Sequence, residues 1–204
     1  MQTLQVKQGS DEWLKVRLGK PTASRFGDII TPDKGEKSKT YTAYLYELLG
    51  ELIAGEKDET YKSQWMDRGN ELEQKAKEKY EFLKDATIET VGIVFNDDLT
   101  IGASPDGLIG NKGGIEIKCP KSSTIVKYML EDRLPLIYKP QVQGNLWICE
   151  REYWDFIAYH PNTNMFIHRV YRDEDYIKKM SFYLNDFVDE LKEKYETLKD
   201  KVWV

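Results

Sequence analysis

Several features are scarce in this chain of 204 residues, and each absence excludes a class of protein. Two cysteines and two histidines are too few for a disulfide framework or for a cluster held by four thiolates. No apolar run reaches the roughly 20 residues that span a membrane, and the first residues lack a signal peptide's apolar segment. We therefore predict a soluble, cytoplasmic protein in a reducing compartment.

Positive charge is also in short supply. The 30 lysines and arginines are outnumbered by 35 aspartates and glutamates, which gives a net charge of −5. This balance argues against a protein that coats nucleic acid by bulk attraction. A DNA enzyme is not excluded, because it can gather its cations in a cleft while carboxylates around a metal lower the total. The length and the 40% hydrophobic content predict one globular domain over residues 1–204.

Hydrophobic spacing and turn signals predict an α/β fold, with a mixed central β-sheet of about five strands flanked by helices. Helices are expected over residues 11–18, 22–30, 41–53, 64–82, 122–130, 141–149 and 173–198. Strands are expected over residues 87–95, 99–103, 108–109, 114–119, 153–159 and 166–171. Residues 31–39 form a polar, lysine-rich loop, and residues 135–140 are expected to be a connector.

The most informative motif contains two carboxylates and a lysine. Asp106 stands at a turn signal, and Glu116 and Lys118 follow in a short apolar strand. Because side chains alternate along a strand, Glu116 and Lys118 share one face, while Ile115 and Ile117 share the other. Two carboxylates bind Mg²⁺ or Mn²⁺, and a lysine beside them can hold or activate a water. The motif therefore predicts metal-dependent phosphodiester hydrolysis.

A structural interpretation of the same residues is available. Asp106-Gly107 is a strong hairpin signal by itself. Glu116 and Lys118 could be the solvated side of an amphipathic edge strand. The spacing alone leaves both interpretations open, because short motifs match by accident.

The chain as a whole resembles the phage lambda exonuclease family, also called the YqaJ-type viral recombinase family. The matching segments are Trp13-Leu14-Lys15-Val16-Arg17-Leu18-Gly19, Thr22-Ala23-Ser24, Arg68-Gly69-Asn70-Glu71-Leu72-Glu73, Ser104-Pro105-Asp106-Gly107-Leu108, Glu116-Ile117-Lys118-Cys119-Pro120, Gln141-Val142-Gln143 and Tyr159-His160-Pro161. The nuclease motif alone is shared by many families, but its combination with the flanking segments is far more specific.

This resemblance implies the PD-(D/E)xK restriction-endonuclease-like nuclease fold and a 5′-to-3′ exonuclease of double-stranded DNA. Such an enzyme starts at 5′-phosphorylated ends, releases mononucleotides and leaves 3′ single strands for recombination by strand annealing. The resemblance also implies two Mg²⁺ ions, for which Mn²⁺ may substitute, and a homotrimeric ring that threads DNA. The implied partner is a single-strand annealing protein, and the implied location is the cytoplasm of a bacterial host.

Roles can be assigned to Lys118 and to five further residues of the predicted metal site. Asp106 and Glu116 are expected to bind the metal together with the backbone carbonyl of Ile117, since hard cations accept carbonyl oxygen. Lys118 is expected to orient or deprotonate the attacking water. The resemblance adds Glu73, on a helix, and Gln141 as supporting catalytic residues. Among several glutamates of a charged helix, Glu71 competes with Glu73, and only the resemblance selects Glu73.

Four residues match the positions that the resemblance assigns to the 5′-phosphate: Arg17, Thr22, Ser24 and Ser104. Arginine offers a bidentate fork to phosphate, and hydroxyls at a helix start add donors. Taken singly, Arg17 is an ordinary helix arginine, and Thr22 and Ser24 are ordinary caps.

Two rival functions keep part of this interpretation. One is a restriction-like or structure-specific endonuclease of the same fold, for which an end-phosphate pocket around Arg17 and Ser24 has no use. The other is a catalytically inactive module that binds DNA ends. Intact Asp106, Glu116 and Lys118 argue against it, because a mere binder has no reason to keep a metal site.

Overall fold

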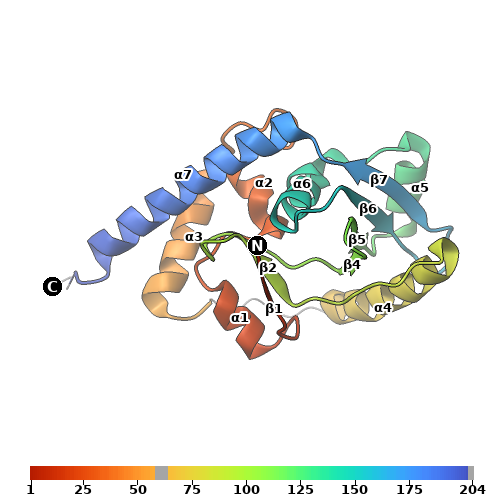
Figure 1. Cartoon of the computed structure of the whole chain (residues 1–204), viewed down its shortest axis with the longest axis horizontal. Helices are drawn as coiled ribbons and strands as arrows, with labels where there is room; N and C mark the ends of the chain where they lie inside the picture. The colour runs from red at the N-terminus through yellow and green to blue at the C-terminus, as the bar shows by residue number, and fades with distance from the viewer. Residues whose placement is uncertain (58–63, 202–204) are drawn as a thin grey trace.

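The computed structural model describes residues 1–57 and 64–201, and for residues 64–70 it describes the backbone alone. The helices are α1 (Asp11–Arg17), α2 (Phe26–Ile29), α3 (Tyr41–Ala54), α4 (Gln64–Lys84), α5 (Ser122–Glu131), α6 (Lys139–Ile148) and α7 (Glu174–Leu198), with 3₁₀ turns η1 (Ala23–Arg25) and η2 (Leu136–Tyr138). The strands are β1 (Gln2–Leu4), β2 (Ile93–Phe95), β3 (Gly102–Ala103), β4 (Gly107–Ile109), β5 (Gly113–Lys118), β6 (Tyr153–Ala158) and β7 (Phe166–Tyr171). Figure 1 shows how these elements are arranged.

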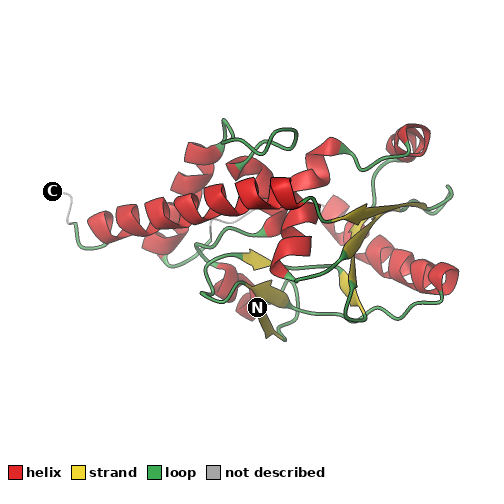
Figure 2. Ribbon diagram, turned by 45° about the horizontal axis from the view of Figure 1, so that its top comes forward, coloured by secondary structure: helices red, strands yellow, loops and turns green. Residues whose placement is uncertain are grey.

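A mixed sheet of four strands, in the order β4-β5-β6-β7, carries the carboxylate and lysine motif. Strands β5 and β6 are parallel, and the two outer pairs are antiparallel. Parallel neighbours need a long crossover, which here contains α5 and α6. Helices flank this sheet in Figure 2. The predicted α/β class, a mixed sheet flanked by helices, is confirmed.

Different helices cover the two faces of this sheet. Ile115 and Ile117 of β5 lie in the buried cluster that packs against α4. The opposite face receives α5 and α6, which belong to the larger buried cluster. Glu116 and Lys118 point to the α6 side, where Glu116 accepts hydrogen bonds from that helix. The strand alternation expected from the sequence is therefore present.

A second, three-stranded sheet has the order β1-β2-β3 and only antiparallel pairs. The chain leaves this sheet and enters the four-stranded one through Ser104-Pro105-Asp106. Asp106 therefore lies at the junction of two sheets, not in a hairpin between paired strands. The glycine that follows serves a close approach, because a Cβ atom on Gly107 would lie 2.2 Å from a methyl carbon of Ile88.

Local interactions fix the end of α1, which carries Arg17. The helix begins at Ser10, whose hydroxyl accepts a hydrogen bond from the Trp13 backbone N–H at 3.3 Å. It ends before Gly19, whose φ of +63° favours glycine. The Gly19 N–H donates to the buried carboxylate of Glu51 at 3.0 Å. This turn holds Arg17 in place at the last turn of the helix.

The structure differs from the sequence-based expectations in several places. The strands expected over residues 87–95 and 99–103 are only Ile93–Phe95 and Gly102–Ala103. The helix expected over residues 22–30 is a 3₁₀ turn followed by the four-residue α2, because Thr22 is extended and pairs with Gly102. The helix expected from residue 141 begins at Lys139, with Pro140 in its first turn. The described strands number seven in two sheets, and β1 was not predicted, because three residues show no reliable alternation.

The long helix α7 closes the molecule along α3 (Figure 1). Its Phe187 ring contacts the rings of Tyr41 and Tyr44, with centroids 5.0 and 5.6 Å apart. These three aromatic side chains are fully or almost fully buried. None of the helices in the described ranges is long and apolar enough to cross a bilayer.

Candidate active site

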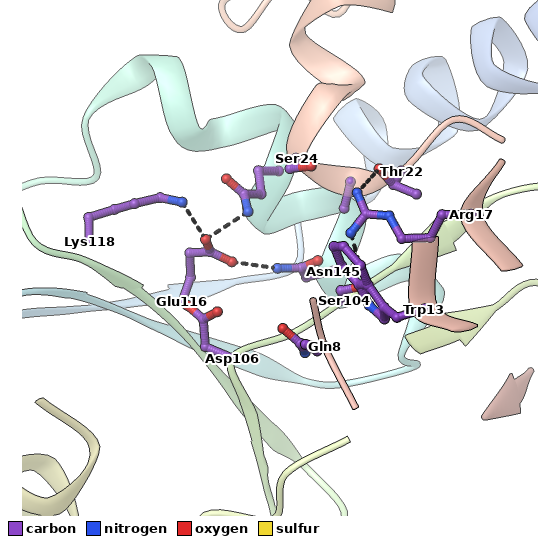
Figure 3. A pocket seen from close by; sticks show the side chains of 12 residues that line it. Gln8, Trp13, Arg17, Thr22, Ser24, Ser104, Asp106, Glu116, Lys118 and Asn145 are labelled. Atoms are coloured by element: carbon purple, nitrogen blue, oxygen red, sulfur yellow. Dashed lines mark hydrogen bonds and ion pairs between the residues drawn. The ribbon is translucent and has the colours of Figure 1, made fainter. Parts of the chain in front are cut away.

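A cavity of about 200 Å³ lies between α1, η1, α6 and the end of β5 (Figure 3). It brings together eight of the ten residues predicted from the sequence. They are Arg17, Thr22, Ser24, Ser104, Asp106, Glu116, Lys118 and Gln141. Its walls also contain Gln8, Trp13, Ala23 and Asn145. Glu73 and Ile117 lie outside this set.

Glu116 is the most heavily bonded side chain in the cavity, and it is only 2% exposed. Its Oε1 atom accepts from Lys118 Nζ at 2.6 Å and from Gln141 Nε2 at 2.7 Å. Its Oε2 atom accepts from Asn145 Nδ2 at 3.0 Å. A buried carboxylate needs such donors, because an unpaired charge in a dry site is costly. The burial contradicts the interpretation of Glu116 as a solvated edge residue.

Asp106 faces the same strand from the junction of the two sheets. Its Oδ2 atom accepts a hydrogen bond from the Ile117 backbone N–H at 2.6 Å. Burial raises the pKa of Asp106 well above its ordinary value, and repulsion from Glu116 and Glu73 adds to this rise. The Ile117 N–H and Lys118 oppose the rise without cancelling it. Carboxylates crowded in this way are stabilised by a cation.

Lys118 supplies positive charge to this cluster. Burial lowers the pKa of Lys118, but the charge of Glu116 and the hydrogen bond to it outweigh burial and leave the pKa raised. The ammonium group is therefore protonated at neutral pH. Its Nζ atom also lies 5.4 Å from the ring centroid of Tyr138.

Ile117 contributes its backbone N–H to the site, whereas the sequence-based prediction concerned its carbonyl as a metal ligand. In a strand, the N–H and C=O of one residue point to the same edge. The Ile117 N–H points to Asp106, so its carbonyl also faces the Asp106 side and not the ladder with β6. The pairing of β5 with β4 extends only from Gly113 to Ile115, so β4 does not cover this edge at Ile117.

Glu73 lies on α4, on the other face of the sheet. It is half-buried and forms an ion pair with Lys77 at 2.8 Å, whereas Glu71 is exposed. Glu73 is also close enough to Asp106 to raise its pKa by repulsion. The orientation of α4 thus favours Glu73 over Glu71. Glu73 lines a second hollow of about 410 Å³, and Gln8 lines both this hollow and the first cavity.

The far end of the cavity is built around Arg17 (Figure 3). Its guanidinium group donates to Thr22 Oγ1 at 2.9 Å and more weakly to Ser104 Oγ at 3.4 Å. The same group lies over the Trp13 ring, 3.8 Å from its centroid, and the Trp13 indole N–H donates to Ser104 Oγ at 3.1 Å. Ser24 stands at the rim and is exposed.

Arg17 has no carboxylate partner in the ion pairs of the described residues. Burial lowers the pKa of Arg17 to about 10, and Tyr44 and Glu51 offset this only in part. The side chain is still charged at neutral pH. A sheltered guanidinium that meets only hydroxyls and an aromatic face is suited to bind an anion.

Three cavity residues were not found from the sequence: Gln8, Trp13 and Asn145. Gln8 Nε2 donates to the carbonyls of Val91 and Pro105 at 3.0 and 2.9 Å, which ties the N-terminal segment to the residue before Asp106. Asn145 is 1% exposed and lies one helical turn after Gln141, a spacing that could have indicated a shared face. Trp13 stood inside a matching segment, four residues before Arg17, and had the same signal.

The oxygen donors of the cavity fit a hard divalent cation. No three side chains among the described histidines, cysteines, aspartates and glutamates form a metal-binding group. The available ligands are the carboxylates of Asp106 and Glu116 and the carbonyl of Ile117. Mg²⁺ commonly takes one or two carboxylates and completes its shell with waters and phosphate oxygens. In this structure Lys118 balances the charge of Glu116.

A model of one protein family, the YqaJ-like viral recombinase domain, matches residues 12–152. The structure of an alkaline exonuclease (LHK-Exo) from Laribacter hongkongensis is similar over 93% of this chain and 96% of its own, with 31% identity and a TM-score of 0.84. A complex of LHK-Exo with dAMP gives the same values. No curated protein sequence matches the chain.

A more distant structure supports the fold alone. The phage-related exonuclease from Haemophilus somnus 129PT is 16% identical and covers 86% of this chain and 96% of its own, with a TM-score of 0.62. The resemblance and the fold class inferred from the sequence are therefore confirmed.

Proposed function

Because the chain belongs to the YqaJ-like viral recombinase domain family, we propose that it is a metal-dependent exonuclease of double-stranded DNA. It digests one strand in the 5′-to-3′ direction from a 5′-phosphorylated end and releases mononucleotides. The product is a duplex with a 3′ single-strand overhang, ready for phage-type recombination by strand annealing. The similarity to an alkaline exonuclease supports the nuclease class.

One observation carries the choice of an exonuclease in this proposal. The cavity has Arg17 at one end, paired with no carboxylate among the residues that the structure describes, and the carboxylate and lysine cluster at the other. An end-phosphate held by Arg17 places the next internucleotide bond toward Glu116. A pocket for a terminal phosphate is of use to an exonuclease and of none to an enzyme that cuts within a duplex. This arrangement favours the exonuclease over the endonuclease.

The side chains then have separate tasks. Arg17, Thr22, Ser24 and Ser104 bind and orient the terminal phosphate by charge-assisted hydrogen bonds. Trp13 holds the guanidinium plane, and its indole N–H donates to Ser104 Oγ, the oxygen that also accepts from Arg17.

At the other end, Asp106, Glu116 and the Ile117 carbonyl would hold Mg²⁺. The cations, when bound, supply Lewis-acid stabilisation of the attacking and leaving oxygens. Lys118 orients the attacking water and stabilises the charge that develops on the phosphate. Gln141 aligns Glu116 and the scissile phosphate, and Glu73 supports the site from the opposite face of the sheet.

The family resemblance also supports a homotrimeric ring, a single-strand annealing protein as partner, and action in the cytoplasm of a bacterial host. We adopt these as parts of the proposal. A trimer in solution would have a mass near three times the 23.9 kDa of the chain, which mass photometry measures directly.

The test is digestion of a linear duplex labelled at the 5′ or the 3′ end of one strand, with Mg²⁺ or with chelator. A covalently closed circle is the control. We expect immediate release of the 5′ label as mononucleotide, only with Mg²⁺, and an intact circle. Cleavage of the circle would replace the proposal with an endonuclease. End binding without any cleavage would indicate an inactive end-binding module.

A further inference from the structure

The order of the residues along the cavity indicates in which direction the DNA beyond the cleaved bond continues. Arg17 lies at one end of the site and Lys118 at the other, with Glu116 between them (Figure 3). A strand whose terminal phosphate is at Arg17 and whose first internucleotide phosphate is at Glu116 continues past Lys118. Strand β5 ends there, and the chain continues as the segment 119–130, which contains all of α5 except its last residue, Glu131.

This segment is unusually basic for the chain. Between Glu116 and Glu131 there are three lysines, Lys118, Lys121 and Lys127, and no aspartate or glutamate. The chain as a whole has 35 acidic residues and a net charge of −5. Cations concentrated beside the site are what an otherwise acidic enzyme needs to hold a polyanion.

Both lysines beyond the cavity are available to a ligand. Lys121 is exposed, and its side chain forms no hydrogen bond or ion pair within the described ranges. The Lys127 side chain is 67% exposed, and its contact with Glu131 at 3.7 Å is a long surface pair. Such exposed pairs contribute about 0–1 kcal/mol, so a phosphate can replace Glu131 at little cost.

Helix α5 presents these lysines from a firmly packed base. Ile125 and Tyr128 are buried, and the Tyr128 ring lies 6.1 Å from the ring of Phe156 in β6. Lys121 is the N-cap residue of α5, and Lys127 lies roughly 9 Å further along the helix axis and about 120° around it. The two lysines therefore contact different phosphates of a duplex that crosses α5.

The second hollow is a less suitable path for the strand. It contains the carboxylate of Glu73, which repels phosphate. Lys77, on the same wall, is already paired with Glu73 at 2.8 Å, and its side chain is only 15% exposed. With Lys7 the hollow has two lysines and one glutamate, the same count as residues 119–131, but the Lys127 side chain is 67% exposed and its ion pair is longer, at 3.7 Å.

We propose that the duplex immediately 3′ of the cleaved bond lies along residues 119–130, with Lys121 and Lys127 contacting its phosphates. The inference rests on the exonuclease function proposed above and adds the surface that holds the rest of the substrate. Exposed contacts of this kind provide affinity without reading sequence.

The test compares Lys121→Ala and Lys127→Ala with the matched control Lys112→Ala. Lys112 is 69% exposed and precedes β5, so it lies at the opposite end of the strand from Lys118. Binding is measured in chelator by fluorescence anisotropy across a salt series. The two probes are a 5′-phosphorylated duplex of about 20 base pairs, long enough to pass α5, and a 5′-phosphorylated dinucleotide.

For the duplex, each lost phosphate contact should reduce the slope of log K against log salt by about 0.9. The advantage of the wild type over each variant should then shrink about 3-fold between 50 and 200 mM salt, by the same relation. Dinucleotide affinity should not change, because the dinucleotide does not reach α5. The control Lys112→Ala should behave as wild type with both probes.

Two results would overturn the inference while leaving the exonuclease intact. One is that Lys121→Ala and Lys127→Ala bind the duplex with the same slope of log K against log salt as Lys112→Ala. The other is an equal loss of dinucleotide binding, which would place the lysines in the catalytic cavity. Failure of the proposed function is recognised separately, because the wild type would then show no preference for 5′-phosphorylated duplex. Lys121→Gln repeats the test with a longer side chain if alanine disturbs the helix start.

Discussion

Replacement of Arg17 by alanine tests the proposed end-phosphate pocket most directly. Hydrogen bonds from a charged group to a phosphate contribute about 1.5–3 kcal/mol each, and 1.36 kcal/mol corresponds to a factor of ten in rate. For a 5′-phosphorylated duplex, kcat/KM should therefore fall roughly 10- to 150-fold. For a 5′-hydroxyl duplex it should hardly change. The wild type's preference for the phosphorylated end would disappear.

The structure also predicts the effect on stability. Burial lowers the pKa of Arg17 from 12.5 to about 10, which corresponds to at most about 3 kcal/mol of unfavourable free energy in the charged state. Removing the charge relieves this cost, although the stacking on Trp13 is lost as well. Arg17→Ala should therefore unfold at a temperature no lower than the wild type, measured without phosphate.

The effect of inorganic phosphate on the unfolding temperature should also differ between the wild type and Arg17→Ala. A ligand that binds only the folded state raises the unfolding temperature. Phosphate should stabilise the wild type and have no effect on Arg17→Ala. The control is Lys15→Ala, an exposed change on the same helix, which should keep both responses. Equal losses on phosphorylated and hydroxyl ends, or clear destabilisation of Arg17→Ala, would refute the pocket and make Arg17 a structural residue.

Three further predictions concern the carboxylate end. Lys118→Ala should lower the single-turnover cleavage rate at least 100-fold while leaving duplex binding in chelator intact, and equal losses of both would make Lys118 structural. Asn145→Ala removes the donor to Glu116 Oε2 and should weaken Mg²⁺ binding by calorimetry 10- to 100-fold, an effect typical of a residue that orients a ligand. Because burial and repulsion raise the pKa of Asp106 in the folded state, unfolding free energy in chelator should fall as pH rises above the unfolded value of about 3.9. Denaturant titrations across pH measure this fall, and Asp106→Asn should remove it; an unchanged slope in the variant would assign it to another group.

The fold was predictable where the sequence has a strong local pattern. The apolar spacing of α3 and α7 and the turn residues around β5, β6 and β7 predicted those elements within one residue at each end, whereas β2 is six residues shorter than expected. The prediction failed where a distant contact decides the backbone. Thr22 is extended because it pairs with Gly102, and this interrupts the helix expected over residues 22–30. No pattern in the local sequence predicts such a pairing.

The candidate site was likewise predictable where local sequence patterns decide it and unpredictable where distant contacts do. Alternation in β5 was enough to place Glu116 and Lys118 together, and their contact at 2.6 Å bears this out. The choice between Glu71 and Glu73 required the rotation of α4, which leaves the first exposed and the second half-buried near Asp106. Asn145 was missed because an asparagine in a helix has no distinctive pattern until its partner is known.

By itself the sequence determined the chemistry of the site: two carboxylates and a lysine at fixed spacing, together with the segments that resemble a nuclease family. These follow from residue type and strand period, which are local properties. The tertiary structure alone decided the arrangement, since the path of the chain brings Arg17 to Ser104, 87 residues away, and gives the guanidinium no carboxylate partner in the described part of the chain. That assembly depends on the packing of α1, η1 and α6 around the junction of two sheets. Packing of distant segments depends on the whole buried core, which no short window of sequence contains.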